Sequence, residues 1–499
     1  MIDLTVAQVA DIVGGRLVDI TPEEAASRRI TGTVEFDSRA VTPGGLFVAL
    51  PGARSDGHDF AVGAVRDGAA AVLAARPVGV PAIVVPPAPA ADAQSGVLEH
   101  DTDGAGAAVL GALAKLAAAV AAELAAGGMT IVGVTGSSGK TSTKDLIAAV
   151  LRPLGDVVAP PGSFNNELGL PWTVLRATRE TDYLVLEMSA RHPGNIAALA
   201  ATARPSIAVV LNVGTAHLGE FGSREAIAAT KSELVQALPP DGVAILNADD
   251  PAVAAMATLT AARVVRVGRS EQADVGAGDV ELDELARPRF TMRAGSGRTG
   301  GDQVDVQLAV HGEHQVGNAL CAAAVALECG ASLEQVGTSL GGAQASSRRR
   351  MEVHTRADGV TVINDAYNAN PDSMRAGLQA LAVMARGRGE RSWAVLGEMG
   401  ELGEESVIEH DRVGRLAVRL DISRLVVVGT GRPMSAMHHG AVMEGSWGSE
   451  STMVPDADAA IELLRSELRP GDVVLVKASN AVGLGELADT LVQAGDEGP

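Results

Sequence analysis

Short apolar runs alternate with helical patterns along most of this chain. Between residues 101 and 344 the runs are MTIVGVT, DYLVLEMS, SIAVVLNV, GVAILNAD and RVVRVG. Their Val and Ile residues are nearly continuous and lack the alternation of polar and apolar positions that marks a half-exposed strand, so we expect strands buried on both faces. The pattern predicts a largely parallel sheet flanked by helices in the middle of the chain.

Two further series of runs lie on either side of this region. Residues 1 to about 100 contain short strand-like runs and end in VVPPAPAADAQSG, which is typical of a linker. After the basic turn SSRRRMEV come GVTVINDAYN, SWAVLGEM, RLVVVGT and DVVLVKAS. We predict three consecutive α/β domains at 1–100, 101–344 and 345–499, the last a Rossmann-like doubly wound sheet. Residues 270–304 are expected to form an exposed β excursion with loops.

The length and the long apolar segment agree with a water-soluble protein of several domains. At 499 residues the chain can form roughly three domains, each with its own core. The N-terminus carries acidic residues where a signal peptide needs basic ones. The longest apolar stretch, residues 105–128, is mostly alanine and is interrupted by Lys115 and Glu123. We expect a soluble helix there rather than a membrane span.

Cysteine content and charge indicate which cellular compartment and which classes of binding partner to expect. Cys321 and Cys329 are eight residues apart in a helical pattern, too far to bridge, so we expect free thiols in a reducing cytoplasm. Together with the interrupted apolar stretch, this leads us to expect no membrane insertion. With 61 acidic and 40 basic residues the formal charge is -21. This balance disfavours nucleic acid or an anionic membrane as the main partner. It does not exclude small anionic substrates, because a local basic pocket can override the average field.

The segment IVGVTGSSGKTST has the context of a phosphate-binding loop, since it follows an apolar run and precedes the helical pattern KDLIAAVL. The residues that would turn backbone N–H groups towards phosphate are Gly136, Ser137, Ser138 and Gly139. Lys140 would neutralise phosphate charge, and the Thr141 hydroxyl could ligate Mg²⁺. Val134 stands where the usual first glycine would be. The alternative is a tight glycine turn with a surface lysine.

Three other polar residues are candidates for a metal site. Glu187 ends the run DYLVLE, where a carboxylate could be a second Mg²⁺ ligand; the alternative is an acid exposed to water at a strand end. His217 follows the run ending in VVLNV and, taken alone, is more often structural than a ligand. Lys231, taken alone, is expected to be a solvated lysine on a helix.

Several blocks of sequence, in this order and spacing, resemble the Mur ligases over nearly the full length of the chain. The blocks are DSRAVTPGGLFVALPGARSDGHDF (37–60), TGSSGKTSTKD (135–145), SFNNELGLPWTVL (163–175), LEMSARHPGNI (186–196), LNVGTAHLGEFGSREAIAATKSEL (211–234), GEHQVGNALCAAAVA (312–326), NDAYNANPDSM (364–374) and LGEMGELGEES (396–406).

The resemblance implies an ATP-dependent, amide-forming ligase of peptidoglycan precursor synthesis. Within the family, the chain most closely resembles the member that joins D-alanyl-D-alanine to the carboxylate of UDP-N-acetylmuramoyl-tripeptide through an acyl phosphate. The element NANPDSM supports this choice, because Asp372 would repel the diamino-acid carboxylate that an N-P-R element reads in the preceding enzyme. The three domains would bind the uridine nucleotide, ATP and the dipeptide, in that order, and the third would close onto the second. We expect a monomer.

The resemblance also implies roles for individual residues. Lys140, His217 and Lys231 would be catalytic, with Lys231 carbamylated beside two Mg²⁺ ions. Metal ligands would be Thr141, Glu187, His217 and Lys231. Contacts to ATP besides the loop would come from Asn318, Arg350 and Asp365. Substrate contacts would come from Ser38, Arg39, His58, Asn165, Asn166, Tyr367, Asn368 and Asn370.

Alternatives remain at this stage. A related ligase, such as a folate polyglutamylating enzyme, should lack the DSR…DGHDF unit, and a P-loop switch protein would need the guanine-reading N-K-x-D element, which the sequence does not contain. A third alternative is a ligase fold without activity. It rests on Asn480, which stands where the family pattern suggests an arginine facing the incoming amino acid. Either another residue compensates or dipeptide binding is weak.

Overall fold

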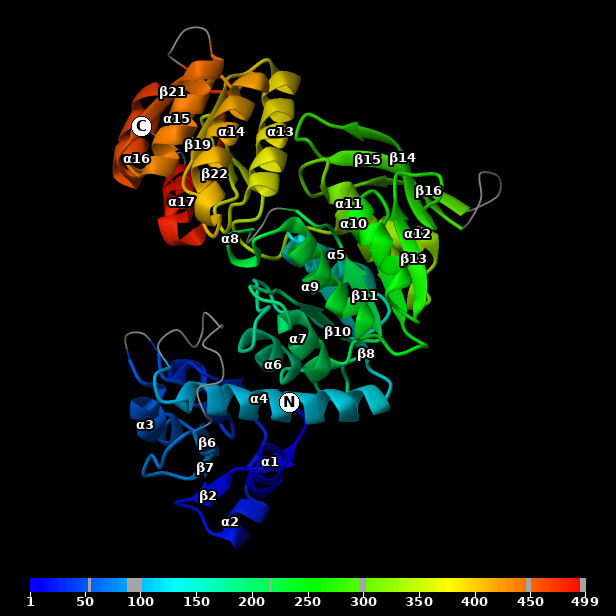
Figure 1. Ribbon diagram of the computed structural model, residues 1–499, viewed down its shortest axis with the longest axis vertical. Helices are drawn as coiled ribbons and strands as arrows, with labels where there is room; N and C mark the ends of the chain where they lie inside the picture. The colour runs from blue at the N-terminus through cyan, green and yellow to red at the C-terminus, as the bar shows by residue number, and fades with distance from the viewer. Residues whose placement is uncertain (53–54, 88–100, 215–217, 296–301, 446–449, 494–499) are drawn as a thin grey trace.

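The computed structural model describes residues 1–52, 55–87, 101–214, 218–295, 302–445 and 450–493. These residues form three successive α/β units, each built on its own main sheet, which lie one above another in Figure 1. We call them the N-terminal, central and C-terminal units. The predicted fold class is confirmed; the domain boundaries at residues 100 and 344 stay predictions.

The N-terminal unit contains a five-stranded sheet. Its order is β2 (Arg16–Val18), β7 (Ala82–Val84), β6 (Ala71–Ala74), β5 (Leu46–Val48) and β4 (Val34–Glu35). Only the pairing of β2 with β7 is antiparallel. A separate pair joins β1 (Leu4–Thr5) to β3 (Arg29–Ile30), and α1 (Val6–Val13) starts at a capping box of Thr5 and Gln8.

The central unit contains a nine-stranded sheet. Its order is β16 (Asp302–Gln307), β15 (Pro288–Ala294), β14 (Val275–Leu282), β13 (Arg263–Gly268), β12 (Val243–Asn247), β11 (Ile207–Val210), β8 (Thr130–Thr135), β10 (Tyr183–Glu187) and β9 (Val157–Val158). The strands from β9 to β14 in this order are parallel. The predicted apolar runs are therefore confirmed as neighbouring strands. Four of them are buried along most of their length, but β13 is not buried on both faces, because Arg263 and Arg266 are exposed.

Residues 270–304 differ in part from the expectation of an exposed excursion. The described part continues the central sheet as the antiparallel strands β14, β15 and β16. Phe290 and Met292 on β15 are buried, whereas their neighbours in sequence are more exposed. Every second residue of the strand is therefore buried, and this face of the strand packs against α11 (Gln315–Glu328) and the rest of the core. The segment is thus an extension of the sheet.

The C-terminal unit has a six-stranded sheet. Its order is β17 (Glu352–Thr355), β18 (Thr361–Asn364), β22 (Val473–Lys477), β19 (Ser392–Leu396), β20 (Arg424–Val428) and β21 (Ser451–Val454). Only β17 is antiparallel to its neighbour. The helices on this sheet are α13 (Pro371–Arg388), α14 (Ser406–Arg419), α15 (Arg432–Glu444), α16 (Ala457–Glu467) and α17 (Leu484–Gln493). In this sheet, as in the central one, polar residues follow the buried parallel strands, where ligands of such sheets bind.

The long apolar helix α4 (Ala105–Ala126) runs between the N-terminal and central units (Figure 1). By length and composition it could cross a membrane. It packs, however, against α1, α6 (Gly169–Val174) and α7 (Asn195–Ala203), and 56% of its most apolar window is buried in the protein. This is the burial expected of a core helix.

Candidate active site

The phosphate loop, residues 136–139, connects β8 to α5 (Lys140–Leu151). Gly139 has φ 83°, a left-handed conformation that side chains disfavour, and a Cβ there would lie 2.8 Å from Asn318 Oδ1. Glycine is therefore required at this position. The free N–H groups and the dipole at the start of α5 favour an anion in front of the loop.

Asn212, which the sequence analysis did not identify, holds this loop in place. Its Oδ1 accepts a hydrogen bond from the Ser138 N–H at 3.0 Å, and its Nδ2 donates to the Ser138 carbonyl at 3.2 Å. Asn212 follows β11, so the rule that polar residues after buried strands line a site could have found it.

Lys140 points back over the loop, where its Nζ donates to the Gly136 carbonyl at 2.7 Å. Burial lowers the pKa of Lys140 to about 8; the Arg350 guanidinium also lowers this pKa, whereas Glu187 and Glu401 raise it. An anionic ligand in the loop would favour the charged ammonium. The surface lysine of the alternative interpretation is excluded.

Glu187, at the end of β10, is 2% exposed, so it is not an acid solvated at a strand end. Its Oε2 accepts hydrogen bonds from the Thr141 hydroxyl at 3.3 Å and the Ser163 hydroxyl at 3.0 Å. Its Oε1 is buried and has no hydrogen-bond partner among the described residues. A buried carboxylate oxygen without a partner, next to a threonine hydroxyl, fits the oxygen ligands that Mg²⁺ prefers.

Lys231 lies on α9 (Arg224–Gln236) and is 6% exposed, so it is not a solvated lysine either. Burial and, to a smaller extent, the positive charge of Lys140 together lower its pKa to about 7. The two ammonium groups are thus close enough to repel each other. His217, the remaining predicted ligand, lies outside the described residues.

The C-terminal unit reaches the phosphate loop through Arg350. Its Nη2 donates to the Thr141 hydroxyl at 3.2 Å, and its guanidinium carbon lies 4.1 Å from the centroid of the Tyr367 ring. Arg349 and Met351 on either side have φ of 60° and 52°. Positive φ outside glycine costs about 1–3 kcal/mol, and such strain clusters at functional sites.

Asp365 follows β18 and is held within the C-terminal unit. Its Oδ1 accepts from the Met351 N–H at 3.1 Å, and its Oδ2 forms an ion pair with Lys477 Nζ at 2.6 Å. Lys477, buried at the end of β22, also donates to the Asn368 carbonyl at 2.9 Å. The sequence analysis quoted this strand but missed its lysine.

A cavity of about 1160 Å³ lies between the central and C-terminal units. The predicted site residues that line it are Ser137, Ser138, Gly139, Lys140, Thr141, Asn165, Asn166, Asn318, Arg350, Asp365, Tyr367, Asn368 and Asn370. Glu187 touches this wall through Thr141, whereas Gly136 and Lys231 do not line the cavity. Segments far apart in sequence thus form one polar chamber beside the phosphate loop.

Asn165 and Asn166 lie on a loop that also contacts the N-terminal unit. Asn165 Nδ2 donates to Ser163 Oγ at 2.7 Å, and Asn166 Oδ1 accepts from the Gly169 N–H at 2.9 Å. Trp172, in the helix that follows, donates its Nε1–H to Glu35 Oε2 at 3.1 Å. This contact connects the wall of the cavity to the end of β4.

The predicted substrate residues of the N-terminal unit do not line the cavity. Ser38 and Arg39 form a short 3₁₀ turn, where Arg39 pairs with Asp37 at 2.7 Å and its side chain is 88% exposed. Arg39 is therefore accessible to a ligand that reaches this unit.

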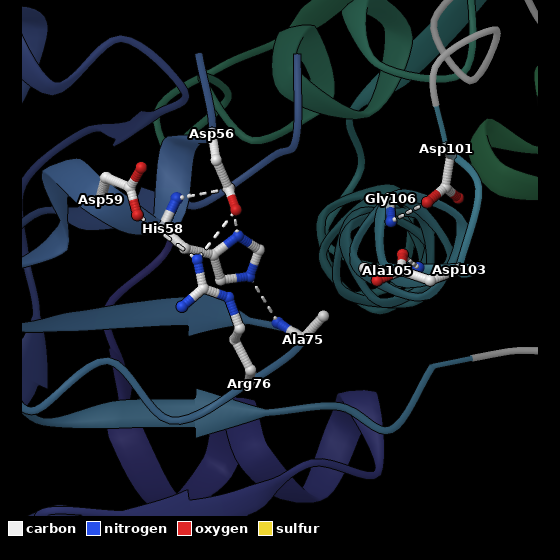
Figure 2. A network of polar contacts seen from close by, with 9 residues as sticks. All are labelled: Asp56, His58, Asp59, Ala75, Arg76, Asp101, Asp103, Ala105 and Gly106. Carbon is white, nitrogen blue, oxygen red and sulfur yellow. Dashed lines mark hydrogen bonds and ion pairs between the residues drawn. The ribbon is translucent and has the colours of Figure 1, made fainter.

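His58 is a different case, because its ring is buried and both nitrogens are occupied (Figure 2). Nδ1 donates to Asp56 Oδ1 at 2.6 Å, and Nε2 accepts from the Ala75 N–H at 3.0 Å. Arg76 pairs with the other oxygen of Asp56 at 2.8 Å. In this structure neither ring nitrogen is free for a ligand, and the ring holds the 56–60 turn against the segment after β6; a contact of His58 with substrate stays a prediction.

Comparison with protein families gives three matches along the chain. Residues 31–122 match the Mur ligase family catalytic domain, residues 134–326 the Mur ligase middle domain, and residues 349–480 the Mur ligase glutamate ligase domain.

Whole-length relatives agree with these matches. UDP-N-acetylmuramoyl-tripeptide--D-alanyl-D-alanine ligase of Mycobacterium bovis is 72% identical over 99% of this chain and 98% of its own length. The Escherichia coli enzyme of that name is 36% identical over 86% of each chain. The structure of MurF from Acinetobacter baumannii has a TM-score of 0.81 at 30% identity, covering 98% of this chain and 99% of its own. The structure of MurF ligase from Thermotoga maritima in complex with ADP has a TM-score of 0.75 at 29% identity. It covers 93% of this chain and 98% of its own. The chain belongs to the Mur ligase family.

Proposed function

We propose that this chain is the ATP-dependent ligase that joins D-alanyl-D-alanine to the free carboxylate of UDP-N-acetylmuramoyl-tripeptide. Its relatives at 72% and 36% identity carry this activity in their names. The observation that carries the proposal is the chamber in which the phosphate loop of the central unit faces polar residues of the C-terminal unit. Such a chamber can hold a triphosphate, a carboxylate and an amine together.

The nucleotide would bind with its phosphates in front of residues 136–139. The N–H groups at the start of α5, the Lys140 ammonium and the Arg350 guanidinium would oppose their charge. We assign Asn318, whose amide lies beside Gly139, and Asp365 to the rest of the nucleotide, as the family resemblance implies.

Thr141 and Glu187 fit one Mg²⁺ ion, because the Oε1 atom of Glu187 is buried without a partner among the described residues. A second ion would be held by carbamylated Lys231 and by His217. When bound, Mg²⁺ would offset the repulsion between the triphosphate and the substrate carboxylate.

The environment of Lys231 favours carbamylation. A pKa of about 7 leaves much of this amine neutral at neutral pH, and only a neutral amine can attack carbon dioxide. The reaction forms an N–C bond, releases one proton and replaces a repelled ammonium with an anion. A ¹³C-bicarbonate-labelled carbamate signal that is missing from the Lys231→Arg variant would test this assignment.

The chain would act in two steps. The γ-phosphoryl group passes to an oxygen of the tripeptide carboxylate, its bond to the β-phosphate oxygen breaks, and ADP leaves. The dipeptide amine then attacks the acyl carbon, the bond to phosphate breaks, and the amine gives up a proton. Lys140 and Arg350 would stabilise negative charge on the moving phosphoryl group, while the facing walls of the chamber limit access of water.

The three units would divide the substrates among them, within our proposed boundaries of 1–100, 101–344 and 345–499. The N-terminal unit would bind the uridine nucleotide through Ser38 and Arg39. Asn165 and Asn166 would meet the peptide or sugar amides, and Tyr367, Asn368 and Asn370 the dipeptide. The enzyme would act as a cytoplasmic monomer; the unpaired thiols of Cys321 and Cys329 fit a reducing compartment.

Phosphate release from ATP tests the function directly. Release should require UDP-N-acetylmuramoyl-tripeptide and D-alanyl-D-alanine together and should be near background with either one alone. Release that L-glutamate or a folate stimulates instead would favour the folate-type ligase. No release under any combination would favour an inactive ligase fold.

A further inference from the structure

The cavity between the central and C-terminal units is lined by several basic side chains, and most of them already have a partner. The five that do are Lys140, Arg191, Arg224, Arg350 and Lys477. His314 also lines the cavity and is exposed, but desolvation holds its pKa below the usual value of a histidine, so it is neutral at neutral pH. Arg375 is different, because it is an exposed and permanently charged side chain that has no hydrogen bond or ion pair with any residue that the structure describes.

The position of Arg375 relates it to the phosphate loop. It lies on α13, three residues after Asp372. This helix is at the edge of the C-terminal unit next to the central unit (Figure 1). The Asp372 carboxylate faces Gly214, where a Cβ would lie 2.0 Å from Asp372 Oδ2 and 3.3 Å from Ser137 Cβ. Residues at i and i+3 share one face of a helix. One side of α13 therefore presents an acid beside the phosphate loop and a base further along the wall.

Asn480 adds a second donor to the same wall. It begins the 3₁₀ turn Asn480–Val482, is exposed, lines the cavity, and has no side-chain hydrogen bond to any residue in the described ranges. A guanidinium and an amide N–H₂ together present several donors, which suits a carboxylate.

We propose that Arg375, together with Asn480, binds the terminal carboxylate of the incoming dipeptide. This inference rests on the proposed function. D-Alanyl-D-alanine is a zwitterion whose ends lie about 7 Å apart when the chain is extended. Asp372 and Arg375 carry the opposite charges on the same face of α13, with Cβ atoms about 5–6 Å apart. The amine would thus lie towards the phosphate loop, where it must attack.

On this proposal, a dipeptide is preferred to a single amino acid, whose amine and carboxylate lie closer together. Arg375 would also supply the cation that the position of Asn480 does not provide.

Steady-state kinetics of full-length Arg375→Gln test the proposal. The KM for D-alanyl-D-alanine should rise about 10- to 100-fold, the scale of a lost hydrogen bond to a charged group, while the KM values for ATP and the UDP-tripeptide stay unchanged. Arg375→Lys should recover part of the loss, because it restores the charge without the planar fork. Arg465→Gln, which alters an exposed arginine of α16 outside the cavity lining, is the matched control and should behave as wild type.

D-Alanyl-D-alaninamide separates this role from a general effect on the site. The amide lacks the carboxylate, so the wild-type KM for it should be raised, and Arg375→Gln should raise it little further. The inference is overturned if Arg375→Gln leaves the dipeptide KM unchanged, or if it affects the dipeptide and the amide equally. A wild-type enzyme that releases no phosphate with the dipeptide would instead overturn the proposed function, and this inference with it.

Discussion

At the scale of single residues, the site is defined by charges that the protein keeps out of water. Lys140, which is partly exposed, and Lys231, which is 6% exposed, both have lowered pKa values, chiefly because desolvation disfavours their charged forms. Keeping ammonium groups in this position costs stability, which the chain tolerates where phosphate, metal or carbon dioxide can bind.

Replacing Lys231 should therefore stabilise the protein without ligands. In the folded protein its pKa is about 7, against 10.5 for the free side chain, so between these values the unfolded state binds more protons and stability rises with pH. Below about pH 7 the full penalty is present. Lys231→Met should add about 1–3 kcal/mol there and flatten the rise up to pH 10, which denaturant unfolding across pH in carbon dioxide-free buffer would measure.

Lys231→Arg is the control for this experiment, because it keeps a buried charge that does not titrate in this range. It should lose the pH dependence contributed by Lys231 without gaining stability. A Lys231→Met variant that is less stable than wild type at pH 6 would contradict the buried-ammonium account.

The sequence predicted where a residue lies when a local rule applied, but it did not predict the orientation of side chains. Lys140 and Glu187 lie where they were expected, because each stands at the end of a strand or loop. The sequence does not show which way the ring of His58 turns; here it turns inward to Asp56 and Ala75. Lys477 was missed because its partner, Asp365, is 112 residues away in sequence.

At the scale of elements, the strand runs were predictable because burial on both faces leaves a continuous apolar signature. The antiparallel strands β14 to β16 were harder to place. An alternation of buried and exposed residues shows that one face of a strand is buried, but it does not show which element covers that face. The junction of β8 and α5 was predictable for a different reason. Its glycines allow a backbone conformation that other residues disfavour, and the glycines can be recognised in the sequence.

Two glycine substitutions test that junction. Gly139→Ala should reduce ATP binding and ligase activity at least about 100-fold and cost about 1–2 kcal/mol, because φ is 83° and the new Cβ would meet Asn318. Gly111→Ala, inside α4 with nothing within 4 Å of the added Cβ, should leave activity unchanged and add about 0.5–1 kcal/mol. Nucleotide titration and thermal unfolding would measure both. Equal effects of the two substitutions would refute a special role for the loop conformation.

At the scale of the whole molecule, the contacts between the C-terminal and central units beside the cavity include two made by charged side chains. Arg350 donates to Thr141, and Arg191 of the central unit pairs with Glu401 at 2.9 Å. Glu401 itself has φ 62°. Because the Arg191–Glu401 pair is partly exposed, it contributes at most about 1 kcal/mol, so ligands that add contacts across the cavity can shift the arrangement of the units.

Ligand binding should therefore change the small-angle scattering of the wild-type protein when an ATP analogue and the UDP-tripeptide are added. Arg350→Ala should show a smaller change and lose about 100-fold or more in kcat/KM, because Arg350 of the C-terminal unit donates to Thr141, next to the phosphate loop of the central unit. Arg348→Ala is the matched control: its side chain is 76% exposed and its ion pair, to Asp489, lies within the C-terminal unit. It should scatter and react as wild type does. Wild-type curves that are identical with and without ligands would contradict closure, and the chamber would then have to exclude water in its ligand-free form.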